Sequence, residues 1–321
     1  MIEASSTAAR KDQELSTVLR GLSSMPPRVA PRYFYDAVGS SLFAKITETP
    51  EYYPTRTELA ILRERGRSIA QHVPAGASVI ELGSGSGDKV LALLTHLDKA
   101  RIYRPIEISA SALAITAEAV RSLRPDLDVR PFCGDFMDVM AYSGLPSDAP
   151  KLVYYSGSTI GNFDPPEQAR FLRHLRAQLA PGDVLLLATD LVKDEDVLNA
   201  AYNDAAGYTA AFNKNMLAHL NTRFGASFVP EAFDHVAFYN PSERRIEMHL
   251  SAREPQRVSI GTETLTFTSE RPIHTESSYK FQRDDLESLA QKTGFELVDM
   301  ITDDRGWFAE SVFRVGDERI Q

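Results

Sequence analysis

Short apolar runs alternate with longer segments of helical periodicity between residues 78 and 189. The apolar runs are rich in Val, Ile and Leu and predict buried strands at 78–82, 103–108, 128–132, 152–155 and 184–189. Helices are predicted between them at 89–97, 111–121 and 167–179. Alternation of strand and helix is typical of a parallel sheet with crossover helices, so this region is predicted to be a doubly wound α/β unit.

The alternation stops after Asp190 and resumes near the C-terminus. There, 284–293 has helical spacing, and 295–301 and 308–315 predict two strands joined by a turn at 303–306. The intervening segment, 193–280, combines a helical stretch at 198–224 with strand candidates at 236–240, 246–251 and 265–267. We therefore expect two domains, one made of 56–192 and 281–321, the other a mixed α+β domain made of 1–55 and 193–280.

Composition narrows the classes of partner. With 35 basic and 44 acidic side chains the net charge is −9, which disfavours nucleic acid and anionic membranes. No apolar run approaches the ~18 residues of a membrane span, and residues 1–16 lack the apolar core of a signal peptide. A single cysteine, Cys133, indicates a reducing compartment, so we expect a cytoplasmic protein. No exposed heptad or apolar stripe is evident, and a monomer is expected.

A glycine-rich turn follows the first predicted strand, with the sequence ELGSGSGDK at 81–89. Glycines there let a ligand approach the backbone closely, and a helix N-terminus offers unpaired N–H donors. The dinucleotide fingerprint requires a third glycine at position 88, where this chain has Asp88. NAD is therefore disfavoured, and an NAD-dependent oxidoreductase stays open as an alternative.

S-adenosylmethionine suits the turn better, because it carries no phosphate and needs acids for its ribose hydroxyls and ammonium. Glu107 ends the second strand and is placed to accept both ribose hydroxyls. Asp135 follows the third strand, where it can accept from the adenine amine while Phe136 packs on the ring. Singly, such acids are more often turn or cap residues, but the ordered set favours a methyltransferase over a dehydrogenase.

Seven longer motifs occur in order from about Pro31 to the C-terminus, and on them the chain resembles the histidine N-alpha-methyltransferases of ergothioneine biosynthesis. They are YFYD at 33–36, PEYYPTRTE at 50–58, ELGSGS at 81–86, GDF at 134–136, GSTIGN at 157–162, AYNDAAG at 201–207 and TESSYKF at 275–281. The resemblance implies a class I, Rossmann-like S-adenosylmethionine-dependent methyltransferase with an inserted α+β substrate domain. The implied reaction is three methyl transfers to the alpha-amine of L-histidine, giving hercynine.

The resemblance also implies site residues. By position in the motifs, the residues implied to bind the substrate's amino and carboxylate groups are Tyr52, Asn162 and Tyr202. Tyr35 is implied to face the amine and is the catalytic candidate. The residues implied to hydrogen-bond the imidazole are Glu276 and Ser278, and Met248 is implied to lie beside the ring. The residues implied to bind the cofactor are Gly83, Lys89, Glu107, Asp135 and Phe136. The sequence departs from the family pattern at Glu107, where aspartate is expected, and at Ser277 and Tyr279.

The residues agree with that chemistry. The methyl carbon of a sulfonium is already activated, so the protein mainly orients the reactants and excludes water, and no metal site is expected. A tyrosine of pKa near 10 is a positioning group rather than a base at neutral pH. A carboxylate at Glu276 would be left unpaired by leucine or phenylalanine but not by tryptophan, whose larger ring would meet Met248. Methylation of another aromatic amino acid, such as tryptophan, also stays open, as does a non-catalytic protein that binds S-adenosylmethionine and regulates a partner.

Overall fold

The computed structural model describes residues 2–137, 145 and 149–316. The chain divides into two compact units. Unit 1 comprises Met1–Tyr53 and Lys193–Ser278, and unit 2 comprises Pro54–Val192 and Tyr279–Gln321. Two of the boundaries expected from the sequence, after 55 and after 280, lie two residues beyond the structural ones.

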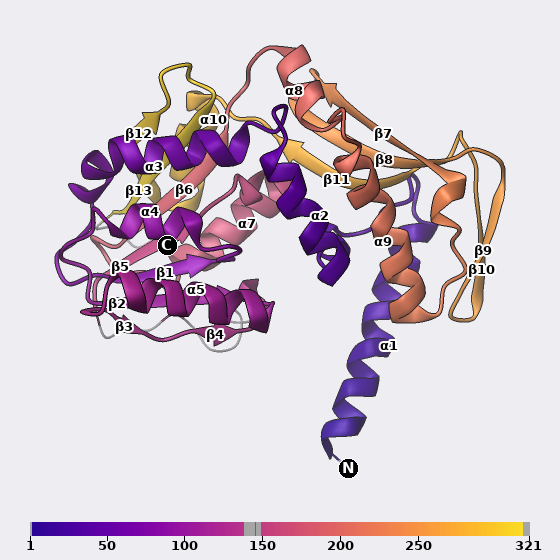
Figure 1. The fold of residues 1–321 in the computed structure, drawn as a ribbon, viewed down its shortest axis with the longest axis horizontal. Coiled ribbons are helices and arrows are strands. Elements are labelled where there is room, and N and C mark those ends of the chain that lie inside the picture. The colour runs from indigo at the N-terminus through magenta and orange to yellow at the C-terminus, as the bar shows by residue number, and fades with distance from the viewer. Residues whose placement is uncertain (1, 138–144, 146–148, 317–321) are drawn as a thin grey trace. The chain divides into compact units, whose positions relative to one another are not determined.

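Unit 2 is built on one mixed sheet in the order β12-β13-β6-β5-β1-β2-β3, with the short β4 also paired to β2 (Figure 1). Its strands are β1 (Ser78–Leu82), β2 (Ile102–Glu107), β3 (Asp128–Val129), β4 (Phe132–Cys133), β5 (Lys151–Tyr155), β6 (Val184–Asp190), β12 (Phe295–Thr302) and β13 (Phe308–Val315). The strands from β6 to β3 pair in parallel, whereas β13 is antiparallel to both β6 and β12. The C-terminal hairpin thus completes the sheet next to β6.

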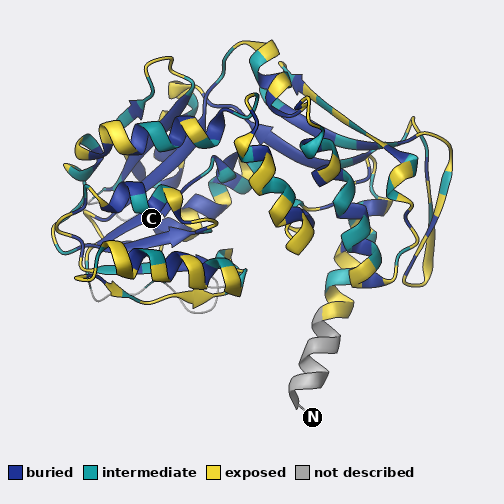
Figure 2. Cartoon of the chain, in the orientation of Figure 1, coloured by how far each residue is buried: buried dark blue, intermediate teal, exposed yellow. Residues whose placement is uncertain are grey.

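Helices cover both faces of this sheet. They are α3 (Pro54–Ala70), α4 (Asp88–Leu94), α5 (Ala110–Leu123), α7 (Pro165–Arg176) and α10 (Arg283–Thr293). Alternate strand residues supply two cores: Val79 packs with α3 and α4, and its neighbour Ile80 packs with α7 and α10. Burial on both faces explains why these strands are continuous apolar runs (Figure 2). The predicted doubly wound α/β class is confirmed.

Unit 1 contains a three-stranded sheet, β11-β8-β7, with helix α9 packed against β7 and β8. Its elements are α1 (Ile2–Ser23), η1 (Pro31–Phe34), α2 (Ala37–Glu48), α8 (Glu195–Ala201), α9 (Tyr208–Phe224), η3 (Pro230–Ala232), β7 (Phe233–Asn240), β8 (Arg245–Ala252), β9 (Gln256–Ile260), β10 (Glu263–Phe267) and β11 (Ile273–Tyr279). β8 alternates buried Ile246, Met248 and Leu250 with more polar residues, so one of its faces forms the core with α9.

The structure departs from the sequence pattern at several points. The helical stretch expected at 198–224 is two helices, because the backbone leaves helical geometry at Tyr202 and enters the left-handed region at Gly207, with φ 75°. The strand expected at 128–132 is replaced by the two-residue strands β3 and β4. Cys133 is exposed at the end of β4, a strand that among the described residues pairs with β2 alone.

None of the helices in the described part of the chain is both long enough and apolar enough to span a membrane.

Candidate active site

The glycine turn between β1 and α4 leaves room beside its backbone. Gly83, Gly85 and Gly87 have φ of 78°, 50° and 80°, a region that other residues rarely adopt. A Cβ at Gly83 or Gly85 would meet no atom within 4 Å, whereas one at Gly87 would collide with Thr116. Buried Ser84 Oγ finds no hydrogen-bond partner among the described residues. The turn therefore combines open space with a polar atom that a ligand can satisfy.

Glu107, at the end of β2, is tied to this turn. Its Oε2 accepts a hydrogen bond from the Gly85 N–H at 3.0 Å, and its Oε1 accepts one from the Ser109 N–H at 3.0 Å. Each carboxylate oxygen has capacity for a second hydrogen bond. The side chain is thus held at the open glycine turn in the place predicted for a group that binds two vicinal hydroxyls.

Asp135 and Phe136 follow β4, and both make contacts within unit 2. Asp135 Oδ1 accepts from the Met137 N–H at 2.8 Å, as in an ordinary turn. The ring of Phe136 packs edge-on against Tyr155 and Phe171, with centroid separations of 5.5 and 6.1 Å. These contacts fix the two residues, and their proposed roles toward adenine stay predictions.

Lys89 makes an ion pair that the sequence did not suggest. Its Nζ lies 2.6 Å from Oε2 of Glu58, a fully buried side chain of α3. Glu58 also accepts from the Gly157 N–H at 3.0 Å and from the Tyr154 hydroxyl at 3.0 Å. Glu58 thus links the helix after the glycine turn to the start of the 157–162 motif. It lies inside the quoted motif at 50–58, but nothing in the sequence marks its partner.

Two further buried acids in unit 2 carry raised pKa values. Burial raises the pKa of Glu81 to about 8, and its Oε2 accepts the Tyr103 hydroxyl at 2.5 Å. Burial and the neighbouring Glu58 raise the pKa of Glu310, on β13, well above its ordinary value. Burial therefore favours the protonated form of both acids.

The 157–162 motif forms a tight loop ending in η2 (Thr159–Asn162), which carries Asn162. A Cβ at Gly161 would lie 2.9 Å from the backbone oxygen of Tyr279, so only glycine fits there. Ser158 has a left-handed φ of 56°, and its Oγ accepts the Asp190 N–H at 2.9 Å. Such strain in a non-glycine residue concentrates at functional loops.

In unit 1 the predicted tyrosines form one connected group. Ring centroids are 5.9 Å apart for Tyr35 and Phe43, 6.1 Å for Phe43 and Tyr52, and 6.3 Å for Tyr52 and Tyr202. The Tyr202 hydroxyl donates to Ser278 Oγ at 2.9 Å. Tyr35 is 43% exposed, so its ring is open to solvent or ligand. The structure thus brings four predicted substrate residues together through Phe43, which sequence reasoning missed.

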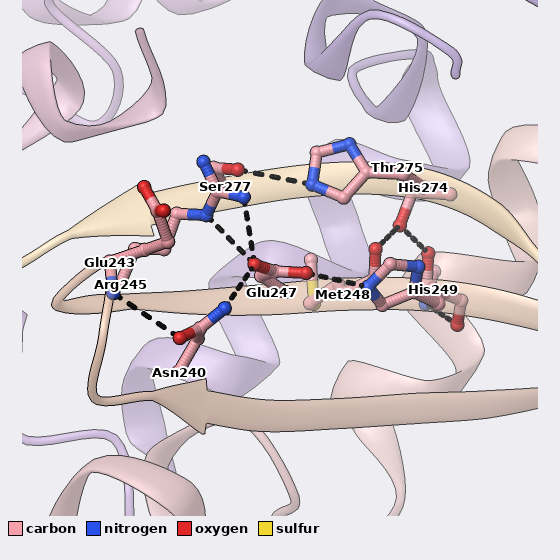
Figure 3. Close-up of polar contacts among 10 residues, drawn as sticks. Asn240, Glu243, Arg245, Glu247, Met248, His249, His274, Thr275 and Ser277 are labelled. Carbon is pink, nitrogen blue, oxygen red and sulfur yellow. Dashed lines mark hydrogen bonds and ion pairs between the residues drawn. The ribbon is translucent and has the colours of Figure 1, made fainter. Parts of the chain in front are cut away.

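The predicted ring-binding residues lie on the neighbouring strands β8 and β11. Met248 is buried on β8, and its carbonyl oxygen accepts from Thr275 Oγ1 at 3.1 Å (Figure 3). Glu276, the residue after Thr275 on β11, is 9% exposed. The carboxylate proposed for ring recognition therefore stands on a strand that is hydrogen-bonded beside Met248.

A charged cluster covers the other face of β8, since Glu247 and His249 alternate with Met248. Glu247 Oε1 accepts from Arg245 at 2.8 Å and from Asn240 at 3.0 Å (Figure 3). Glu247 Oε2 lies 3.1 Å from His249 Nε2. Burial lowers the pKa of His249 below its ordinary value. The cluster holds the strand that carries Met248 from the side opposite α9.

The turn that carries Tyr202 is fixed by two acids that sequence reasoning passed over. Asp204 accepts from the N–H groups of Tyr208 at 2.8 Å and Thr209 at 2.7 Å, which caps the start of α9. Glu51 Oε1 accepts from the Ala205 N–H at 3.1 Å. An aspartate a few residues before a helical run is a capping signal, and it was present in the 201–207 motif.

Comparison with known proteins shows the family of this chain. A family model described as "Histidine-specific methyltransferase, SAM-dependent" matches residues 13–315. The chain belongs to this family. It is 41% identical over 316 residues to the histidine N-alpha-methyltransferase of Mycolicibacterium smegmatis, covering 97% of this chain and 96% of that one. The Mycobacterium tuberculosis enzyme of the same name is 40% identical over 315 residues, with 97% and 96% covered.

A more distant relative is the ergothioneine biosynthesis protein 1 of Neurospora crassa, 30% identical over 292 residues. That match covers 85% of this chain but 32% of the larger fungal protein. The family predicted from the seven motifs is thus confirmed, and the chain is an S-adenosylmethionine-dependent methyltransferase.

The donor fits the residues of unit 2 as the family requires. The backbone at Gly83 and Gly85 supplies space, and Glu107 supplies a carboxylate. The Ser84 hydroxyl, which has no partner in the described part of the chain, supplies a polar atom. A ligand with a ribose, an ammonium and no phosphate matches that donor and acceptor set. NAD, which the sequence already disfavoured, is not the cofactor of this family.

Other features of the described residues lie outside this site. A surface hollow of about 310 Å³ in unit 2 is lined by Arg56, Thr57, Ala60, Glu64, Asp303, Asp304 and Arg305. None of the predicted site residues lines it. Within the described ranges, no three His, Cys, Asp or Glu side chains are grouped to hold a metal ion.

Proposed function

We propose that this methyltransferase transfers three methyl groups in succession from S-adenosylmethionine to the alpha-amine of L-histidine. The product would be hercynine, on the route to ergothioneine. Support comes from family membership across residues 13–315 and from the names of the relatives. The observation that carries the substrate side is the connected group of Tyr35, Tyr52, Tyr202 and Ser278 in unit 1.

The proposed donor site lies in unit 2. When bound, the donor supplies a methyl carbon already activated by its sulfonium. Glu107 accepts the two ribose hydroxyls while its backbone contacts keep it at the glycine turn. Asp135 and Phe136 receive the adenine. Lys89 has three N–H donors, of which the Glu58 ion pair uses one, so it can also meet a ligand carboxylate.

The proposed amine site is aromatic. Tyr52, Tyr202 and Asn162 hold the amino and carboxylate groups, and Tyr35 faces the amine. The amine must be neutral to attack, and an ordinary tyrosine is protonated at neutral pH, so these hydroxyls position the amine rather than deprotonate it. The ring of Phe43 contacts those of Tyr35 and Tyr52 edge to face. Aromatic rings can surround a trimethylammonium without needing a hydrogen-bond donor from it.

Substrate choice rests on Glu276 and Ser278. A nearly buried carboxylate that accepts an imidazole N–H is left unpaired by an aliphatic or phenyl side chain, which is a strong penalty. Met248 is buried on the adjacent strand, and the family resemblance implies that it lies beside the ring, where a larger indole would meet it. Both features favour the smaller ring of histidine over tryptophan.

The lone, exposed Cys133 and the net charge of −9 support a cytoplasmic enzyme that acts on a small molecule without nucleic acid or membrane. We expect a monomer.

The experiment that tests the proposal offers each of the twenty amino acids with S-adenosylmethionine and measures mass gain. We expect histidine to gain one, two and then three methyl groups and to be used far better than the others. A larger mass gain on tryptophan than on histidine would indicate that another aromatic amino acid is the substrate. Binding of histidine and donor without any release of S-adenosylhomocysteine would indicate a regulator instead.

A further inference from the structure

A buried amide in unit 1 uses both of its N–H donors and its carbonyl oxygen in hydrogen bonds. Asn213, on α9, is fully buried. Its Nδ2 lies 3.0 Å from the carbonyl oxygen of His249 and 2.8 Å from Nδ1 of His235. Its Oδ1 accepts from Thr275 Oγ1 at 2.7 Å. One side chain thus joins α9 to all three strands of the β11-β8-β7 sheet.

The chemistry of the partners fixes the direction of each bond. The His249 carbonyl can only accept, so the nitrogen of Asn213 must face it. The second N–H of that nitrogen then donates to His235 Nδ1, which must be unprotonated. The proton of neutral His235 is therefore on Nε2, and it donates to the Tyr202 carbonyl oxygen at 3.0 Å. A single neutral tautomer of His235 satisfies both contacts.

The hydrogen-bond network of Asn213, His235 and Thr275 reaches, at both ends, residues proposed to bind the amino acid. At one end it holds the backbone of Tyr202, whose hydroxyl bonds Ser278. At the other end Thr275 shares its one hydroxyl proton between Asn213 Oδ1 at 2.7 Å and the Met248 carbonyl at 3.1 Å (Figure 3). The next residue along β11 is Glu276. The network therefore sets the relative places of the amino-group side and the ring side.

We propose that His235 and Asn213 are positioning residues that hold the amino-acid site in its binding geometry, and that protonation of His235 releases that geometry. Protonation would place an N–H on Nδ1 opposite an Asn213 N–H across 2.8 Å. Rotation of the amide would relieve this repulsion only by turning its oxygen toward the His249 carbonyl. The inference rests on the proposed function, since it concerns the same amino-acid site.

The surroundings of His235 set the pH range. Burial lowers the pKa of His235, and Lys214 on α9 acts in the same direction. The Tyr202 carbonyl and Asp204 act in the opposite direction. On β8 the paired residue is the apolar Leu250. Because the pKa is lowered, the neutral form is present above about pH 6.5 and is lost only at lower pH.

The test replaces His235 with glutamine, which keeps an N–H at the ε position for Tyr202 but does not titrate in this range. We measure kcat/KM for histidine from pH 5 to 9 and divide the value for His235→Gln by that for the wild type at each pH. The ratio cancels the titration of the substrate's own imidazole and amine. We expect the ratio to be constant above pH 7 and to rise threefold or more at the acid end of the range, where His235 of the wild type takes up a proton.

The matched control is His72→Gln. His72 also makes a hydrogen bond between elements, with Nε2 3.0 Å from Asp299 Oδ2, but in unit 2. Its ratio should stay flat across the same range. A flat ratio for His235→Gln as well would overturn the proposal. Absence of histidine turnover by the wild type would instead count against the proposed function, and the ratio would then be measured on the amino acid that is methylated.

A second variant tests the other member of the network. Asn213→Asp replaces the N–H donors with an anion, which repels the His249 carbonyl and favours protonated His235. We expect the KM for histidine to rise tenfold or more while the Kd for S-adenosylhomocysteine changes less than twofold. An equal loss of both affinities would indicate general unfolding and a merely structural Asn213. The unchanged Kd shows that unit 2 is folded, and His235→Gln carries the test if Asn213→Asp does not fold.

Discussion

The polar groups around the candidate residues differ in kind between the two units. In unit 2 they are buried acids: Glu58 pairs with Lys89, and burial raises the pKa of Glu81 and of Glu310. In unit 1 the Asn213 and His235 side chains make neutral hydrogen bonds, each with one possible direction. The donor-binding unit is therefore expected to respond most to substitutions that change buried charge. The amino-acid-binding unit is expected to respond most to substitutions that change the direction of a hydrogen bond.

The largest expected effect comes from Glu58→Ala, which removes the partner of Lys89 inside unit 2. Breaking a buried pair leaves an uncompensated charge, so the free energy of unfolding should fall by about 3–5 kcal/mol. Equilibrium unfolding in urea measures it. Glu118→Ala, at an exposed position of α5, is the matched control and should change stability by less than about 0.5 kcal/mol. Equal effects of the two would contradict the role of the buried pair.

Next in size is Glu276→Ala in unit 1. Loss of a hydrogen bond to a charged group costs about 1.5–3 kcal/mol, so kcat/KM for histidine should fall roughly 10- to 150-fold. The affinity for S-adenosylhomocysteine should not change. Glu263→Ala removes an exposed carboxylate from β10 and serves as the control. Unchanged histidine turnover by Glu276→Ala would remove the proposed basis of ring recognition.

The pH dependence of stability tests the protonated acids of unit 2. Glu81 has a pKa of about 8 when folded and an ordinary value of 4.5. Between those values the unfolded chain releases a proton that the folded chain keeps, so wild-type stability falls as pH rises, by at most about 1.4 kcal/mol per pH unit from this group. The difference in unfolding free energy between Glu81→Gln and wild type should therefore grow from pH 5 to 8 and then level off. Parallel curves would show that Glu81 is ionised when folded.

The smallest expected effect concerns the Tyr202 hydroxyl, which donates to Ser278. A single neutral hydrogen bond contributes about 0.5–1.5 kcal/mol, so Tyr202→Phe should raise the KM for histidine roughly 2- to 12-fold. If the two residues act through this bond, Ser278→Ala should have a similar effect and the double variant should add little to either. Additive losses would mean that each side chain contacts the substrate separately.

Strands buried on both faces were the part of the fold best predicted from the sequence. β1 and β13 begin and end where the apolar runs do, because every residue of β1 and nearly every residue of β13 is buried. The break between α8 and α9 was missed, because apolar spacing continues across a turn that Asp204 and Gly207 stabilise.

Some residues of the candidate site could also be predicted from the sequence, and others could not. The glycine turn and Glu107 follow directly from strand-to-helix spacing, and the tyrosines follow from the motifs. The partners of Lys89 and Tyr154 could not be predicted, since Glu58 and Glu310 lie on elements distant in sequence. Asn213 and His235 carry no motif, and their role depends on the packing of α9 against the sheet.

The most direct measurement of the central claim places the transferred methyl groups on the product. The enzyme is incubated with L-histidine and a donor whose methyl group carries carbon-13, and the product is analysed by heteronuclear NMR. We expect three equivalent labelled methyl groups that correlate with the alpha carbon. Labelled methyls that correlate with ring carbons, or histidine recovered without label while another amino acid carries it, would contradict methylation of the histidine alpha-amine.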